Sequence, residues 1–153
     1  MKKAFIILAI TGIFVSCKQP YPETAKATKA PVDSLIANWQ NKWNSNDSAG
    51  VCGMFAPDVV VIDDELVIMN TKELAGKWVA PNIHLVKNMV TAKLQEWSTS
   101  ERAGYTGKYE LDILMKGAVV AHPHGVFTVN WMKTGQGDWK ITTANINSFM
   151  AKH

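Results

Sequence analysis

The chain has 153 residues and a formal net charge of +3, with 16 basic and 13 acidic side chains. Its charges are scattered, and Arg102 is the single arginine, so the sequence lacks the basic stripe that a phosphate backbone requires, and nucleic acid is excluded as an expected partner. About 120 residues follow the N-terminal segments, which is enough for one domain that buries roughly two thirds of its unfolded surface.

Residues 1–17 have the layout of a bacterial lipoprotein signal peptide. Lys2 and Lys3 precede an apolar run, 4–15, and Ser16 precedes Cys17. The run is too short to span a bilayer, so we expect cleavage before Cys17 and lipid attachment to that cysteine, which would then anchor the protein to a membrane of the bacterial cell envelope, periplasmic or surface-exposed. Ordinary secretory cleavage and a retained signal anchor are the alternatives.

Residues 18–30 mix proline, alanine, threonine and lysine without apolar periodicity, which predicts a flexible tether. The domain is expected over residues 31–150. Once Cys17 is acylated, Cys52 has no cysteine partner in the chain, so we interpret it as a buried structural thiol.

Three helices are predicted in the first half of the domain. Residues 32–43 carry apolar side chains at helical spacing, and Asp47 or Ser48 caps a short second helix that Pro57 should stop. Brief strands follow at 59–62 and 66–69. Asn70 and Glu73 then resemble a capping box, which opens a third helix that Pro81 should interrupt.

The second half of the domain has the period of strands. Residues 89–98, 101–114, 125–133 and 139–148 are β-rich and are separated by turn sequences, so four long strands should form a meander. Apolar and polar side chains alternate along 103–112 and 127–131, which predicts a sheet with one buried face. Helices followed by a one-sided antiparallel sheet indicate an α+β fold, with the helices packed on the apolar face.

The order of these elements and four local strings resemble the NTF2-like superfamily and, within it, the SnoaL-like and DUF4440-type domains. The strings are DSAG at 47–50, MFAPDVV at 54–60, GYTGKY at 104–109 and GDWKI at 137–141. The resemblance covers residues 32–149. It implies a cystatin-like α+β cone, in which a strongly bent antiparallel sheet wraps the N-terminal helices and leaves a pocket at its open end.

The resemblance also implies candidate catalytic positions. In the ungapped register, Asp63 falls where ketosteroid isomerases of this superfamily place a general-base aspartate, and Trp39 falls where they place an oxyanion-binding tyrosine. An indole supplies an N–H donor but lacks an acidic phenol. The acidic or histidine residues of SnoaL-type cyclases are replaced by Thr142, Thr143 and Ala144. The alternative for Asp63 is a solvated turn carboxylate.

The histidines give weaker signals. His84 follows the third predicted helix near the expected mouth of the cone, where it could act as an acid or base, or lie exposed at a helix end. His122 and His124 flank a proline and lack a third ligand nearby, so we expect no metal site, and no cofactor is expected either. His153 is the C-terminal residue.

Aromatic side chains could line the pocket or fill it. Trp139, Ile141, Thr143, Asn145 and Asn147 should share one face of the last strand, apolar first and polar later, as at a pocket with a wet mouth. We expect ligand contacts from the following residues: Trp39, Trp78, Tyr105, Tyr109, Trp131 and Asn145. Trp97 is a further aromatic candidate, and simple core packing is the alternative for all the aromatic residues.

Three functions are consistent with these patterns. The leading hypothesis is a lipid-anchored domain that binds a small, mostly apolar molecule. The second is an enzyme that transfers a proton next to a carbonyl, in an isomerisation, dehydration or cyclisation, with Asp63 as base and His84 or Asn145 at the oxyanion. The third is a module that forms a homodimer through the outer sheet face. The polar row Thr106, Lys108, Glu110, Thr128 and Asn130 weakens this third hypothesis without excluding it.

Overall fold

The computed structural model describes residues 28–149. The predicted signal peptide, its Cys17 and residues 18–27 of the predicted tether lie outside the described residues. Within 28–149, no helix is long and apolar enough to cross a membrane.

Two helices open the domain, as predicted. Helix α1 spans Val32–Asn44 and buries one face, and α2 spans Ser48–Gly53. The Asp47 carboxylate caps α2 by accepting a hydrogen bond of 2.7 Å from the Gly50 N–H. Helix α2 ends at Gly53, four residues before the predicted stop at Pro57. Strand β1 begins at Phe55 and runs to Asp63, so Pro57 lies within the strand. The exposed Pro57 falls where the pairing of β1 shifts register, so its missing N–H is not needed there.

The third helical segment is continuous but irregular. It consists of α3 (Thr71–Glu73), the π-helical η1 (Leu74–Val79) and α4 (Ala80–Asn82). The predicted cap is confirmed, because the Glu73 N–H donates to the Asn70 side chain over 3.0 Å. The predicted interruption of the helix at Pro81 is wrong, since helical structure continues to Asn82. The wider π turn before Pro81 changes the carbonyl positions that a proline ring would otherwise contact in a regular α-helix.

Seven strands form one curved sheet. Besides β1, they are β2 (Leu66–Ile68), β3 (Val86–Ser98), β4 (Arg102–Met115), β5 (Ala118–Ala121), β6 (His124–Lys133) and β7 (Trp139–Ser148). The order is β2-β1-β7-β6-β4-β3, with β5 paired to β4. The four predicted long strands therefore form the expected meander, and the short β5 is an additional strand.

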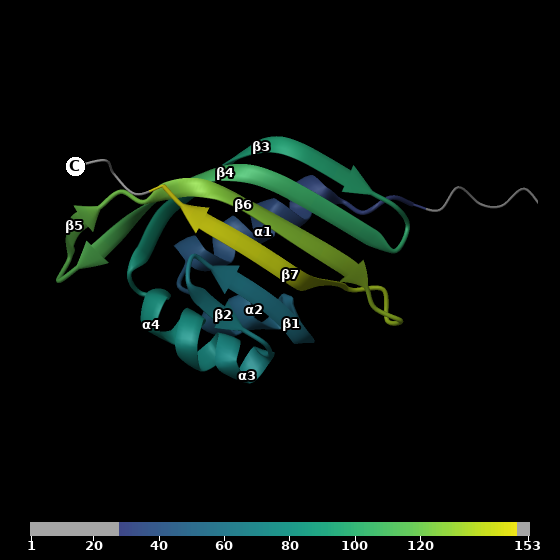
Figure 1. The fold of residues 1–153 in the computed structure, drawn as a ribbon, viewed down its shortest axis with the longest axis horizontal. Helices are drawn as coiled ribbons and strands as arrows, with labels where there is room; N and C mark the ends of the chain where they lie inside the picture. The colour runs from purple at the N-terminus through teal and green to yellow at the C-terminus, as the bar shows by residue number, and fades with distance from the viewer. Residues whose placement is uncertain (1–27, 150–153) are drawn as a thin grey trace, which may run out of the picture.

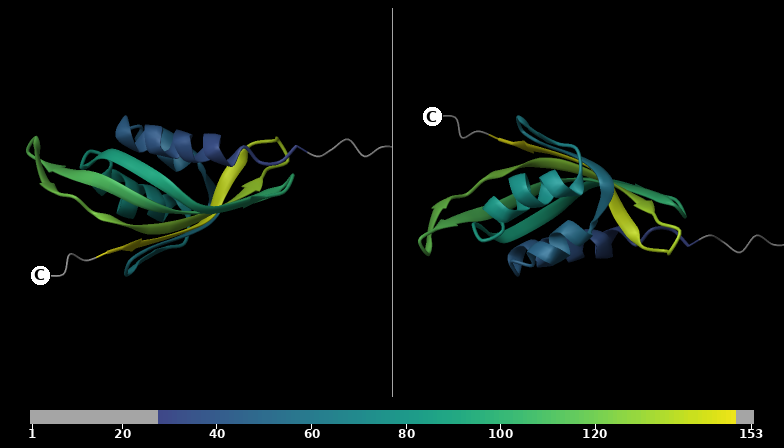
Figure 2. Two further views of the ribbon diagram at one scale, coloured as in Figure 1. Left: turned by 90° about the horizontal axis from the view of Figure 1, so that it is seen from above. Right: turned by 90° about the horizontal axis from the view of Figure 1, so that it is seen from below.

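The α+β fold with helices in a bent sheet is confirmed, with one change to the sheet. The predicted sheet is antiparallel, whereas β1 pairs with β7 in parallel, so the sheet is mixed. Figure 1 shows α1 along the long strands and the α3–η1–α4 segment next to β1 and β2, and the two views of Figure 2 show both helical segments on the concave side. Packing of helices on this face encloses the interior of the cone.

A β-bulge in β3 fixes α1 to the sheet. The β3–β4 pairing shifts between Lys87 and Val90, and Asn88 has a positive φ of 50°. The Asn44 side chain, at the end of α1, donates to the Met89 carbonyl over 3.0 Å and accepts from the Met89 N–H over 2.7 Å. These two bonds satisfy backbone groups that the bulge leaves without ladder partners.

A bulge in β7 reverses the side-chain alternation expected there. Asn130 pairs with Thr143 but Trp131 pairs with Ile141, which leaves Thr142 as the extra residue. Ile141 is buried, as are Ala144 and Ile146 beyond the bulge, so the inward face changes from odd to even positions. The single face predicted for 139–147 is therefore wrong beyond Ile141.

The alternation predicted for β4 and β6 is confirmed. Ala103, Tyr105 and Tyr109 of β4 are buried, and so are the inward residues of β6: Phe127, Val129 and Trp131. Cys52 is half-buried and free, and burial raises the pKa of its thiol. A raised thiol pKa disfavours the nucleophilic thiolate, in line with a structural role.

Candidate functional site

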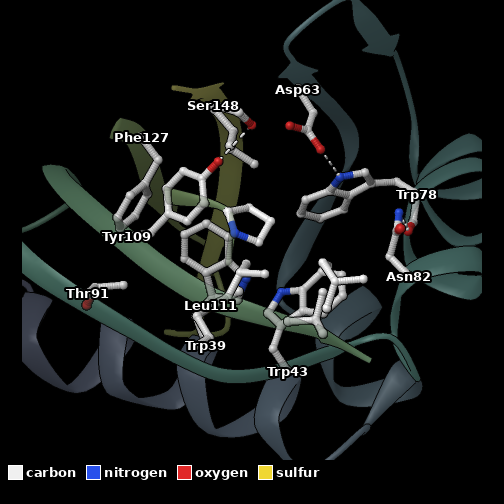
Figure 3. A pocket seen from close by; sticks show the side chains of 15 residues that line it. Trp39, Trp43, Asp63, Trp78, Asn82, Thr91, Tyr109, Leu111, Phe127 and Ser148 are labelled. Carbon is white, nitrogen blue, oxygen red and sulfur yellow. Dashed lines mark hydrogen bonds between the residues drawn. The ribbon is translucent and has the colours of Figure 1, made fainter. Parts of the chain in front are cut away.

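The concave side of the sheet contains a cavity of about 170 Å³ that opens to solvent. Figure 3 shows it between α1, η1 and the inner faces of the long strands. Its walls are formed by the following residues: Trp39, Trp43, Asp63, Trp78, Asn82, Val86, Met89, Thr91, Tyr109, Leu111, Ile113, Pro123, Phe127, Ile146 and Ser148. The lining is mostly apolar, with a few polar groups, as in a small-molecule site.

Five aromatic rings supply much of the wall. Trp39 and Trp43 stand one turn apart on α1, and Trp78, Tyr109 and Phe127 come from η1, β4 and β6. The rings pack edge to face: the Trp39 and Phe127 centroids are 5.2 Å apart, and those of Trp43 and Trp78 are 5.1 Å apart. Edge-to-face pairs add stabilisation beyond area burial, so these contacts favour the observed arrangement of the rings.

Asp63 is the charged residue of the cavity lining. It ends β1 and is half-buried, and its Oδ2 accepts a 2.7 Å hydrogen bond from the Trp78 indole N–H (Figure 3). Burial raises the pKa of the Asp63 carboxyl, the Trp78 bond acts in the opposite direction, and the neighbouring Asp64 charge adds to the increase. The alternative of a solvated turn carboxylate does not fit this half-buried environment.

A hydroxyl pair lies at the same side of the cavity. Tyr109 Oη and Ser148 Oγ are 2.9 Å apart, and the Ser148 N–H donates to the Asp64 carboxylate over 2.8 Å. Asp64 has a φ of 51°, a left-handed conformation that aspartate tolerates at turns. Burial raises the pKa of the Tyr109 phenol, and the charges of Asp63 and Asp64 contribute. The β1–β2 turn is thereby tied to the end of β7.

Two indole donors of the lining have no acceptor. The Nε1 atoms of Trp39 and Trp43 are buried and make no hydrogen bond within residues 28–149. Buried N–H groups without partners are uncommon, and both of these nitrogens are closed to solvent in this structure.

Four of the predicted site residues come together here. Trp39, Trp78, Tyr109 and Asp63 all line the cavity. The residues missed by the sequence interpretation include Trp43, Phe127 and Ser148. Trp43 is recognisable from the sequence, because residues four apart on a helix share a face and Trp39 is a candidate.

The other predicted residues lie elsewhere. Tyr105 and Trp131 are buried in the core and do not line the cavity, and Trp97 is 47% exposed. His84 is exposed beyond α4, outside the lining. The β7 bulge turns the Asn145 side chain away from the interior, so Asn145 is exposed. On the surface it accepts a hydrogen bond from the Asn147 side chain.

His122 lies beside an acidic side chain. Its Nδ1 lies 2.7 Å from Asp112 Oδ1, and Asn88 donates to the other oxygen of the same carboxylate. These contacts hold the pKa of Asp112 below its usual range. In the described part of the chain, no group of three or more His, Cys, Asp or Glu side chains is arranged to hold a metal ion.

Comparison with solved structures defines the class of fold. The chain resembles a ketosteroid isomerase-like protein from Erwinia carotovora atroseptica, with a TM-score of 0.66 and 14% identity over 78% of this chain and 95% of that one. A protein of unknown function from Mycobacterium tuberculosis gives a TM-score of 0.67 and 17% identity over 78% and 75% of the two chains. A cystatin-like protein of unknown function from Nostoc punctiforme gives 0.59 and 12% over 77% and 88%.

These similarities establish an NTF2-like, cystatin-like α+β fold for this chain. At such identities they concern the fold alone, and one fold of this kind carries many functions. No protein-family model matches the sequence, and no curated protein matches it either.

Proposed function

We propose that this protein is a lipid-anchored NTF2-like domain that binds a small, mostly apolar molecule in the cone cavity. The observation that carries the proposal is an open cavity of about 170 Å³ walled by five aromatic rings and a half-buried carboxylate. A dry cavity of roughly 150 Å³ accommodates benzene, so the ligand should be about the size of one ring.

The open cavity favours ligand binding over a module that only dimerises. A pocket filled by Trp39 and Trp131 would have favoured a module that only dimerises. Instead Trp39 forms one wall and Trp131 packs in the core beside β4, so space for a ligand remains. The homodimer stays a prediction.

Blocking the cavity tests the proposal. Leu111 is half-buried in the cavity wall, and Leu111→Trp should fill the space and abolish binding of single-ring fragments that bind the unmodified protein. Isothermal titration calorimetry measures the affinities. The matched control is Leu94→Trp on the exposed side of β3, which should bind as the unmodified protein does. Equal fragment binding by both variants, each folded by circular dichroism, would show that the cavity is not the binding site.

A second candidate function is proton transfer next to a carbonyl. The half-buried position of Asp63 supports it, because a carboxylate with a raised pKa is a better general base than a solvated one. His84 and Asn145 lie outside the cavity lining, so neither is placed to donate a hydrogen bond to an oxyanion there. If this function is correct, Asp63→Asn should abolish turnover of a carbonyl substrate while retaining its binding.

The proposed membrane anchor is tested separately. Cys17→Ala should move the protein from the membrane fraction to the soluble fraction of the cells that express it, because it removes the site of acylation. Metabolic labelling with a fatty acid gives the direct readout, and Cys52→Ala is the control that should keep both label and membrane association. Retention of Cys17→Ala in the membrane without label would support a retained signal anchor instead.

A further inference from the structure

The charge of the cavity is unbalanced. No lysine, arginine or histidine is among its lining residues, whereas Asp63 contributes a carboxylate. Within the described residues, Asp63 forms no ion pair, and its protein donor is the neutral Trp78 indole. A half-buried carboxylate without a cation is unfavourable, since desolvation penalises its charged form.

The aromatic rings around this carboxylate have the composition of a cation-binding cage. Trp39, Trp43 and Trp78 are indoles, the side chains that attract cations most strongly through their faces, and Tyr109 and Phe127 complete the set. The rings come from four different elements and are fixed by edge-to-face contacts, so the enclosure exists before a ligand arrives. A preformed enclosure reduces the ordering cost of binding.

We infer that the ligand of this cavity is a small organic cation, an amine or quaternary ammonium whose positive charge lies among the aromatic rings and faces Asp63. This inference rests on the proposed binding function of the cavity and specifies its ligand class. The cavity volume of about 170 Å³ suits an ammonium group with a short substituent. The Tyr109 and Ser148 hydroxyls, 2.9 Å apart beside the carboxylate, can hydrogen-bond a polar end of that substituent.

The cation is a better match than a neutral molecule of the same shape. Bulky alkyl groups on nitrogen fill apolar space as hydrocarbon does, so both ligands gain from burial. The cation gains further binding free energy from the aromatic rings and from the Asp63 carboxylate. A neutral molecule leaves the charge of that carboxylate without a counterion.

Choline and its neutral carbon isostere, 3,3-dimethylbutan-1-ol, separate these contributions. Calorimetric titration of the folded protein with both probes should give an affinity for choline at least about tenfold higher, which corresponds to one strong cation–π or ion-pair contribution. Asp63→Asn, which keeps the side-chain shape, should reduce this preference by about tenfold. Glu65→Gln, an exposed acid two residues further on, is the control and should leave the preference unchanged.

Each outcome has one meaning. In one outcome, the two probes bind with equal affinity, Asp63→Asn does not change these affinities, and Leu111→Trp abolishes binding. This outcome would overturn the cation inference and would leave the apolar binding function standing. Failure of both probes and of all single-ring fragments to bind would overturn the inference together with the proposed function. A preference for choline that Leu111→Trp leaves unchanged would place the cation outside the cavity and would also overturn the inference.

Discussion

Trp131→Ala is expected to lower the free energy of unfolding by about 3 to 5 kcal/mol, because truncation of a buried tryptophan is among the most costly changes to a protein core. Trp131 lies on β6, is 2% exposed and is among the largest fully buried side chains. Removing the indole leaves a cavity in a packed core, so the lost burial and the lost contacts add. Chemical denaturation monitored by circular dichroism provides the measurement.

Trp97→Ala is the matched control for this substitution. Trp97 stands on β3 and is 47% exposed, so its loss should cost about 1 kcal/mol or less. The comparison tests whether Trp131 contributes to core packing. If Trp131→Ala lowers the free energy of unfolding no more than Trp97→Ala does, Trp131 is not a core residue.

Trp78→Phe should lower the free energy of unfolding at neutral pH by about 1.5 to 3 kcal/mol, because it removes one hydrogen bond to a charged group. We expect a value near the lower end of this range, because Asp63 is only half-buried. The substitution keeps an aromatic ring but removes the N–H that donates to the carboxylate. Because that donor favours the ionised form, its loss should raise the pKa of Asp63 further.

The pH dependence follows from the same bond. Burial raises the pKa of Asp63 overall, so in the unmodified protein this group contributes stability below the ordinary aspartate pKa and loses it as pH rises through the folded value. The Trp78 bond offsets part of that loss when the carboxylate is charged. The difference between Trp78→Phe and the unmodified protein should therefore be largest at neutral pH and shrink as the pH falls through the Asp63 pKa.

Trp43→Phe controls for the smaller ring. Trp43 is buried in the same cavity wall, but its indole N–H has no acceptor within residues 28–149, so this substitution removes a donor without breaking a bond. Its cost should not vary in the pH range where Asp63 titrates. Asp64 and Tyr109 are the titratable groups whose charges are coupled to Asp63, and both variants retain them. The same pH dependence for Trp43→Phe would contradict the role of the Trp78 bond.

The sequence was sufficient for the fold because the signals for the fold are local. Helical spacing identified α1, the pair Asn70 and Glu73 identified a cap, and alternation identified the buried faces of β4 and β6. The errors occurred where backbone irregularity overrides a local pattern. The extra residue Thr142 reversed the face of β7, and a π turn carried a helix through Pro81.

The candidate site was harder to predict because it depends on tertiary contacts. Asp63 was found through its position relative to a family motif, yet its hydrogen bond with Trp78 joins residues from separate elements that no local period relates. Ser148 and Phe127 reach the cavity through strand pairing alone. Tyr105 and Trp131 had the right residue types on inward faces, but their positions along β4 and β6 place them in the core instead of the cavity wall.

The indole N–H resonances of ¹⁵N-labelled protein give the most direct test of binding in the cavity. Three of the six tryptophans, Trp39, Trp43 and Trp78, line the cavity, and the other three do not. Titration with single-ring fragments and choline should shift the resonances of the three cavity tryptophans and leave Trp97 and Trp139 unchanged. Shifts confined to Trp97 would place any ligand on the outer face, and a spectrum unchanged by every compound would contradict a binding function for the cavity.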